Sequence, residues 1–137
     1  MDFDVARFSC FLVNSMADAV IYADTGGKIQ FWNSGAVRIF GYAESEVLGK
    51  SLDIIIPDAL RQRHWDGFER TMLSGESHYQ ADEVLAVPAI RKDERRISVE
   101  FTIVSFRDEA GKMAGIAAVM RDVTKQFNEM KALRQKK

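Results

Sequence analysis

The chain has 137 residues, of which 47% are hydrophobic and 28% charged, with 19 basic and 20 acidic side chains. This length suits one domain with a real hydrophobic core, and the balanced charge argues against a nucleic-acid surface. The single cysteine, Cys10, excludes an internal disulfide. The first residues are acidic where a signal peptide is basic, and no stretch approaches about 18 continuous apolar residues. We therefore expect a cytoplasmic protein without membrane segments.

The first forty residues predict a helix, a hairpin and a second helix. Residues 3–17 repeat apolar side chains with the spacing of an amphipathic helix. Two short apolar runs at about 19–23 and 28–32 flank the turn sequence Asp24-Thr25-Gly26-Gly27, which is typical of a β-hairpin. Asn33 and Ser34 then offer an N-cap for a short helix that ends at Gly41.

The rest of the chain predicts one longer helix, three strands and a final helix. Pro57 and Asp58 are typical helix starts, and the apolar pattern continues to about Leu73. Strands are expected at 83–90, 97–103 and 113–123, and a last helix from Thr124. The order favours an α+β domain, with a five-stranded antiparallel sheet and helices packed on one face.

We find no sequence pattern of an enzyme. The chain has no glycine-rich phosphate loop, no Cys-x-x-Cys, no His-Glu-x-x-His and no nucleophile elbow. The expected role is therefore binding or interaction rather than catalysis.

Three stretches together resemble a PAS sensor domain: ADAVIYADTGGKIQFWNSGAVRIFGYAESEVLGKSL, RKDERRISVEF and RDEAGKMAGIAAVMRDVT. The resemblance covers about residues 15–125. It implies a PAS domain over 18–124, with a capping or dimerisation helix at 1–17 and a signalling helix at 125–137. In that family the helices cup over the sheet and leave a cavity for haem, flavin, small acids or nothing. Glu94 replaces the glycine that is usual in one turn.

The residues themselves single out His64 on the predicted longer helix. Leu60, His64, Phe68 and Met72 are spaced by four and therefore share one helix face. This places the imidazole where an apolar pocket is expected. Gly67 is unusual in mid-helix, where glycine costs about 1 kcal/mol relative to alanine, and it would admit a close neighbour.

The stretch PDALRQRHWDGFER is similar to the haem-binding helix of the rhizobial oxygen-sensor kinases. The resemblance implies haem b held by His64 as the proximal iron ligand, with Arg70 near a propionate and His78 at the rim. Arg61 and Arg63, on the flanks of the same helix, are further candidates for propionates. The predicted site is the iron ligand His64 together with Leu60, Arg61, Gly67, Phe68, Arg70, Met72, Phe101, Ile103, Ile116 and Met120.

One departure concerns the gas that such a site would bind. In the oxygen sensors an arginine on the next strand donates a hydrogen bond to bound oxygen. The matching stretch here, DEVLAVPAI, has Val84 and Leu85 and no arginine. An apolar distal side favours carbon monoxide, nitric oxide or a redox-controlled sixth ligand, for which Met113 and Met120 are candidates by residue type.

Three alternatives remain open at this point. His64 is equally explained as a half-buried structural histidine that pairs with Asp66 or Glu69. The cavity would then serve a small apolar or aromatic metabolite, or would be filled by its own side chains in a ligand-free interaction module. Covalent flavin photochemistry is not expected, because the helix around His64 contains no cysteine.

The two terminal helices predict a homodimer. Their apolar side chains are Phe3, Phe8, Phe11 and Leu12 in the first helix and Phe127, Met130 and Leu133 in the last. The alternative is that the first helix packs on its own sheet. Because the sequence contains no kinase, cyclase or DNA-binding segment, we expect a separate downstream signalling protein or an effector domain missing from this sequence.

Overall fold

The computed structural model describes residues 2–74 and 85–135. Its helices and strands, with η marking 3₁₀ turns, are α1 Val5–Ser15, β1 Ala19–Asp24, β2 Ile29–Trp32, α2 Ser34–Phe40, α3 Glu44–Val47, η1 Leu52–Ile55, η2 Asp58–Leu60, α4 Arg61–Ser74, β3 Leu85–Ile90, β4 Arg96–Arg107, β5 Met113–Asp122 and α5 Thr124–Gln135.

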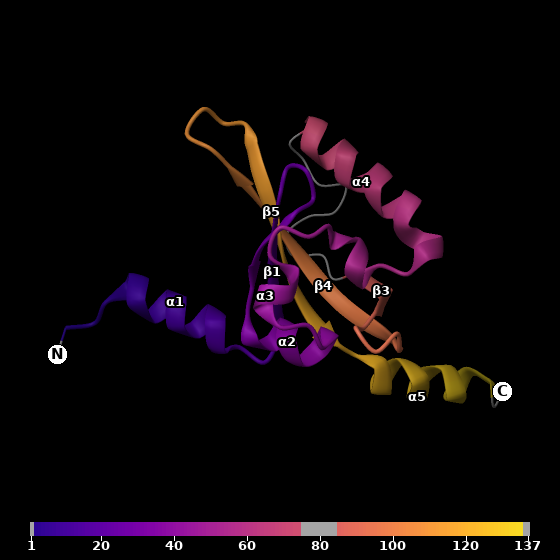
Figure 1. Ribbon diagram of the computed structural model, residues 1–137. Coiled ribbons are helices and arrows are strands. Elements are labelled where there is room, and N and C mark those ends of the chain that lie inside the picture. Colours follow the sequence, from indigo (N-terminus) through magenta and orange to yellow (C-terminus); the bar gives the residue numbers. More distant parts are fainter. Residues whose placement is uncertain (1, 75–84, 136–137) are drawn as a thin grey trace.

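The strands form one antiparallel sheet in the order β2-β1-β5-β4-β3. Helices α2 and α3 lie against the sheet, α4 lies beside it, and α1 and α5 extend from the body of the domain (Figure 1). The α+β class and the five-stranded antiparallel sheet predicted from the sequence are confirmed.

The core lies between one face of the sheet and the short helices. Trp32 of β2 is 1% exposed, and its indole N–H donates to the carbonyl of Tyr42 at 3.0 Å. Its ring is tilted against Phe40 of α2, with ring centres 5.7 Å apart. Ile21 of β1 and Val99 of β4 complete the buried centre. The indole is thus buried with its N–H group satisfied and with apolar neighbours in close contact.

The predicted hairpin and the cap after it are confirmed. The Asp24 carboxylate accepts hydrogen bonds from the backbone N–H groups of Gly26 and Lys28, each at 3.0 Å, and so closes the β1–β2 turn. The Asn33 side chain caps α2 by accepting from the backbone N–H of Ala36. Gly41 ends α2 with a φ of 83°, a conformation that suits glycine.

Two predicted boundaries were wrong. Strand β4 continues past residue 103 to Arg107, because Val104 and Phe106 pair with Ala117 and Gly115 of β5. The helix expected from Pro57 begins as the 3₁₀ turn η2, where the backbone N–H of Leu60 bonds to the carbonyl of Pro57, and becomes α-helical only at α4. The side chains of α4 keep the predicted spacing.

Glu94 adopts a left-handed conformation, with a φ of 68°, in the turn between β3 and β4. A side chain costs roughly 1–2 kcal/mol in this region, whereas glycine adopts it freely but loses more entropy on folding. We expect Glu94→Gly to raise the free energy of unfolding by about 0.5–1 kcal/mol in urea titrations. The matched control is Glu109→Gly, in the β4–β5 turn, where φ is not positive and the same change should lower stability. A fall in stability for both variants would contradict the assignment of strain to Glu94.

Across residues 2–74 and 85–135, no helix is both long and apolar enough to cross a membrane.

Candidate functional site

His64 is half-buried on α4 within a cluster of aromatic rings. Its imidazole is perpendicular to the Trp65 indole, with ring centres 4.7 Å apart, and tilted against Phe68 at 6.0 Å. Its Nδ1 atom is buried and has no hydrogen-bond partner within the described part of the chain. A buried imidazole nitrogen without a partner loses its hydration and gains nothing in return, which is a cost that a ligand can remove.

Burial also sets the protonation of His64. Desolvation lowers the pKa of the imidazole below its ordinary value, and the Asp53 carboxylate opposes this shift only in part. The neutral imidazole is therefore favoured near neutral pH. Neutral imidazole is the form that binds iron and other transition metals.

The lowered pKa makes stability depend on pH. In the unfolded chain a histidine takes up a proton as the pH falls through about 6.5, whereas folded His64 resists protonation. The unfolded state thus binds more protons, and we expect the domain to lose stability from pH 7 to pH 5 relative to His64→Gln. The measurement is urea unfolding of both ligand-free proteins at several pH values. The other histidine, His78, is present in both proteins, so its contribution cancels in the comparison. Parallel pH profiles for the two proteins would contradict the lowered pKa.

Trp65 holds the start of α4 against two other parts of the chain. Its indole N–H donates to Asp53 Oδ1 of η1 at 2.6 Å. Its six-membered ring covers Gly27 of the β1–β2 turn so closely that a Cβ on Gly27 would lie 2.2 Å from Trp65 Cη2. Trp65 was not among the predicted site residues, because nothing in the local sequence pattern links it to a glycine in a distant turn.

The Arg61 guanidinium is occupied by the turns that precede α4. Nε and Nη2 donate to the carbonyls of Ile56 and Asp53, each at 3.1 Å, and Nη1 forms an ion pair with Asp58 at 2.7 Å. These contacts close the 3₁₀ segment, and a role of Arg61 toward a propionate stays a prediction. Arg70, by contrast, is exposed on the same helix.

Gly67 has no close neighbour among the described residues outside its own helix backbone. A Cβ at this position would have only Arg70 Nη2 within 4 Å, at 3.8 Å. Its carbonyl accepts a hydrogen bond from the hydroxyl of Thr71, the one buried side chain of α4. The space beside Gly67 therefore stays open on the face next to His64.

The sheet residues of the predicted site share one face. Phe101 of β4 is opposite Met120 of β5, and Ile103 and Ile116 follow on the same side, all four half-buried. This is the face that carries the core. No ring contact or hydrogen bond joins them to Phe68 within residues 2–74 and 85–135. The predicted site is thus two groups, one on η2 and α4 (Leu60, His64, Phe68 and Met72, all half-buried) and one on the sheet.

Residues 75–84 lie outside the described residues. The predictions for His78 and Val84 fall there. Leu85 begins strand β3, opposite Phe101.

A groove of about 230 Å³ runs between α4 and the β1–β2 turn. Its aromatic wall consists of Trp65 and Phe68, whose rings are nearly perpendicular with centres 5.2 Å apart. The lining is Thr25, Gly26, Trp65, Phe68, Glu69, Met72 and Leu73. The groove is mixed in character, with one acidic side chain beside apolar ones.

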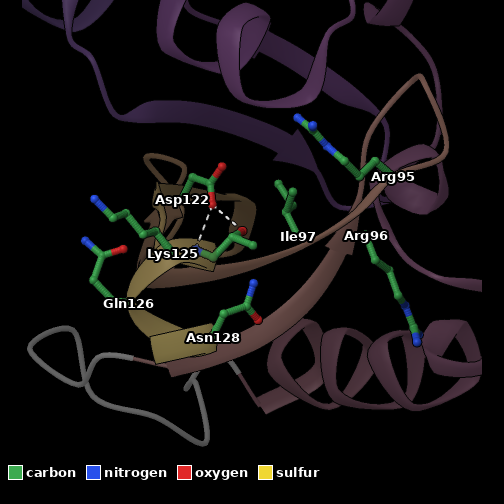
Figure 2. A pocket seen from close by; sticks show the side chains of 8 residues that line it. Arg95, Arg96, Ile97, Asp122, Lys125, Gln126 and Asn128 are labelled. Carbon is green, nitrogen blue, oxygen red and sulfur yellow. Dashed lines mark hydrogen bonds between the residues drawn. The ribbon is translucent and has the colours of Figure 1, made fainter. Parts of the chain in front are cut away.

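A second, polar hollow of about 460 Å³ lies where β4 begins and α5 leaves the sheet. Figure 2 shows that the cationic ends of Arg95, Arg96 and Lys125 point in different directions, so they do not converge on a shared anion. Asp122 accepts hydrogen bonds from the backbone N–H and the hydroxyl of Thr124, as the dashed lines mark.

Thr124 also ties this junction to the sheet. Its Oγ1 accepts from the backbone N–H of Ser98 at 3.0 Å, and the N–H of Val123 donates to the Ser98 carbonyl at 2.8 Å. Asp122 and Thr124 thus join the last strand to the C-terminal helix.

In the residues that the structure describes, no three histidine, cysteine, aspartate or glutamate side chains come together as a metal site.

Comparison with known proteins identifies the family to which this antiparallel sheet and its helices belong. The family model described as the PAS fold matches residues 11–123. The chain belongs to the PAS family, as its sequence resemblance implied.

A crystal structure of a PAS domain from Colwellia psychrerythraea superimposes with a TM-score of 0.77 at 19% identity, covering 89% of this chain and 99% of that one. Among curated relatives, an uncharacterized protein of Azorhizobium caulinodans is 32% identical over 123 residues, which is 89% of this chain and 16% of that protein. The sensor protein FixL of Bradyrhizobium diazoefficiens is 31% identical over 67 residues, 49% of this chain and 13% of that protein. The chain therefore spans less than a fifth of either relative.

Proposed function

We propose that this PAS domain is a sensor module of signal transduction that binds haem b through His64. The observation that carries the proposal is the buried, unpartnered Nδ1 of an imidazole that burial keeps neutral. The aromatic and apolar groups beside it, Trp65, Phe68 and Leu60, limit access of water. Both features fit an axial ligand of haem iron, which needs a neutral imidazole in a water-poor pocket.

The surrounding residues would divide the remaining roles. Arg70 is the cation that we assign to a propionate, because Arg61 is held by its neighbouring turns. The sheet side offers Phe101, Ile103, Ile116 and Met120, which provide apolar surface and no strong hydrogen-bond donor. When bound, haem supplies an iron that takes a diatomic gas or changes oxidation state. The apolar sheet side favours carbon monoxide, nitric oxide or a redox signal over oxygen.

The test is reconstitution with haemin. The purified wild-type protein should take up one haemin per chain and show a strong Soret absorption band, which His64→Ala should lose. Gln62→Ala, an exposed change on the same helix outside the groove lining, should bind haemin like the wild type. A colourless wild-type protein would refute haem binding, and an unchanged Soret band in His64→Ala would refute His64 as the ligand.

A smaller ligand is the second candidate, and the groove between α4 and the hairpin turn favours it. A groove of about 230 Å³ suits a small apolar or aromatic metabolite. Native mass spectrometry of the freshly purified protein should then show a co-purified molecule of low mass. If neither haemin nor a small molecule binds, a ligand-free interaction module is the remaining function.

We also propose that the domain forms a homodimer through α1. None of its residues is buried, and Phe3 and Phe11 are each 72% exposed. The end of α1 is joined to the start of α2, where Asn33 Nδ2 donates to the Val13 carbonyl and Ser34 Oγ to the Asn14 carbonyl. Arg38 of α2 donates to the carbonyl of Met16, directly after α1. Helix α1 extends from the body of the domain (Figure 1), which supports pairing with a second copy over packing on its own sheet. A helix of 11 residues is marginal alone in water.

The outer face of the sheet supplies a surface for the α1 of a second copy. There Tyr22 and Phe106 meet edge to face at 5.4 Å, and Phe106 and Val104 are 45% and 44% exposed. The apolar side chains of α1 expose on the order of 500 Å² per copy, since a large aromatic side chain carries about 150–250 Å². Two reciprocal contacts would bury roughly 1,500–2,000 Å² in total, which is the size of a stable interface.

We propose that the domain passes its signal to a separate downstream protein or to an effector domain. The support is that this chain matches only a small share of each relative's length, 16% of the Azorhizobium caulinodans protein and 13% of FixL. Most of each relative therefore lies outside the matched region. Helix α5, fixed to the sheet through Thr124, is the segment that would carry the signal outward.

A further inference from the structure

Trp65, Asp53 and Gly27 form a contact that we name the Trp65 latch. The indole N–H donates to the Asp53 carboxylate at 2.6 Å, and the indole ring fills the space that Gly27 leaves by having no Cβ. One side chain of α4 is thereby held by η1 and by the β1–β2 turn together. A hydrogen bond to a charged acceptor and close ring packing make this contact stronger than an ordinary surface contact.

The two surfaces that Trp65 contacts are joined to each other by backbone hydrogen bonds. The N–H of Leu52 donates to the Gly27 carbonyl at 3.1 Å, and the N–H of Ile29 donates to the Lys50 carbonyl at 2.8 Å. Lys28 and Ser51 also form an isolated bridge. The hairpin turn and the segment before η1 therefore form one bonded unit, on which Trp65 rests.

That unit leads to helix α1. Asn33 directly follows β2, and its side chain accepts from the N–H of Val20 in β1 and donates to the carbonyl of Val13 in α1, both at 2.8 Å. The side chain is 2% exposed. A displacement of the hairpin thus reaches the end of α1 through one buried amide.

The other side of Trp65 faces the candidate ligand position. Its ring lies 4.7 Å from the His64 ring and 5.2 Å from the Phe68 ring, measured between centres. A group bound to His64 must share this space with the indole. We propose that Trp65 is a positioning residue that transmits occupancy beside His64 to the β1–β2 hairpin and, through Asn33, to α1. The response to a bound group rests on the proposed function of His64. The contacts of the Trp65 latch are present in the chain without any ligand.

Hydrogen–deuterium exchange of the ligand-free protein tests the latch. Trp65→Ala should speed amide exchange at Gly27, Ile29 and Leu52 by about tenfold or more, while Trp65→Phe, which keeps part of the ring, should have a smaller effect. Gln62→Ala is the control, because this exposed side chain bonds to Asp66 on the same helix and does not line the groove, and it should leave these amides unchanged. Hairpin exchange within twofold of wild type in Trp65→Ala would overturn the latch. An equal increase across β4 and β5 would also overturn it, because that would show a loss of overall stability only.

A double-mutant cycle gives an independent measurement. Gly27→Ala places a Cβ inside the indole ring and also strains a φ of 77°. The backbone strain is present with or without the indole, so it cancels in the cycle. We expect Gly27→Ala to lower the folding equilibrium constant in both proteins. The factor should be at least ten times larger in the wild type than in Trp65→Ala. Additive effects would contradict the contact.

Haemin then tests the coupling. In the wild type, haemin should change exchange in the hairpin and in α1, and in Trp65→Phe the change should be confined to α4. If haemin binds and the wild-type hairpin and α1 do not respond, the coupling is refuted and the proposed haem site is retained. If haemin does not bind, the proposed haem function fails. The same exchange comparison is then made with the small molecule that mass spectrometry finds bound to the protein. No response of the hairpin to that molecule refutes the coupling.

Discussion

Replacing Asn33 by alanine should destabilise the domain by about 3–5 kcal/mol, because four hydrogen bonds are lost at a buried position. The side-chain oxygen accepts from the N–H groups of Val20 and Ala36, and the side-chain nitrogen donates to the carbonyls of Val13 and Asp18. All four are backbone groups, so the variant leaves them without a partner. The measurement is the free energy of unfolding in urea, followed by circular dichroism.

The matched control for this change is Ser34→Ala at the next residue. Its hydroxyl makes one hydrogen bond, to the Asn14 carbonyl, at an exposed site. The control should cost no more than about 1 kcal/mol. Equal losses for the two variants would mean that Asn33 is not the joint between α1, β1 and α2.

Changing Phe8 and Phe11 of α1 to serine should convert a homodimer into a monomer. The double variant removes four large apolar side chains from a dimer, so the dissociation constant should rise at least 100-fold. Sedimentation of the wild-type protein at micromolar concentration should give twice the mass of the chain, and the variant should give one. Reducing agent is included, because Cys10 on the same helix is exposed.

The controls for the dimer separate α1 from other exposed apolar groups. Leu73 on α4 is 81% exposed, and Leu73→Ser should leave the mass unchanged. Phe127→Ser combined with Met130→Ser tests α5, whose apolar side chains are also exposed. A wild-type protein with the mass of one chain would refute the homodimer, and a monomer from the α5 variant alone would place the interface on α5 instead of α1.

Local patterns predicted most of the fold, since each is set by neighbours in sequence. The turn Asp24-Thr25-Gly26-Gly27 indicated the hairpin, and Asn33 indicated the cap of α2. The glycine missing at Glu94 marked a turn that is left-handed in the structure. Strand β4 was predicted too short, because the alternation past Ile103 continues on a face that is half open to solvent, where the contrast between apolar and polar positions is weak.

The candidate site was predictable only in part. The helical spacing predicted that Leu60, His64 and Phe68 share one face toward an apolar pocket. In the structure all three are half-buried, with Leu60 in η2 and the other two in α4. The roles of Trp65 and Arg61 were not predictable, because both depend on partners in η1 and the hairpin turn. Such contacts form between residues that periodicity does not relate. Binding of haem by His64 stays a prediction.

The register between β1 and β5 determines how this domain fits into a longer polypeptide. Ala19, at the start of β1, is directly opposite Met120 near the end of β5, and an ion pair of 3.4 Å between Asp18 and Arg121 closes the same end. The chain therefore enters and leaves the sheet at adjacent points. From these adjacent points α1 and α5 extend to opposite sides of the domain (Figure 1), so a change at this end of the sheet would reach both terminal helices.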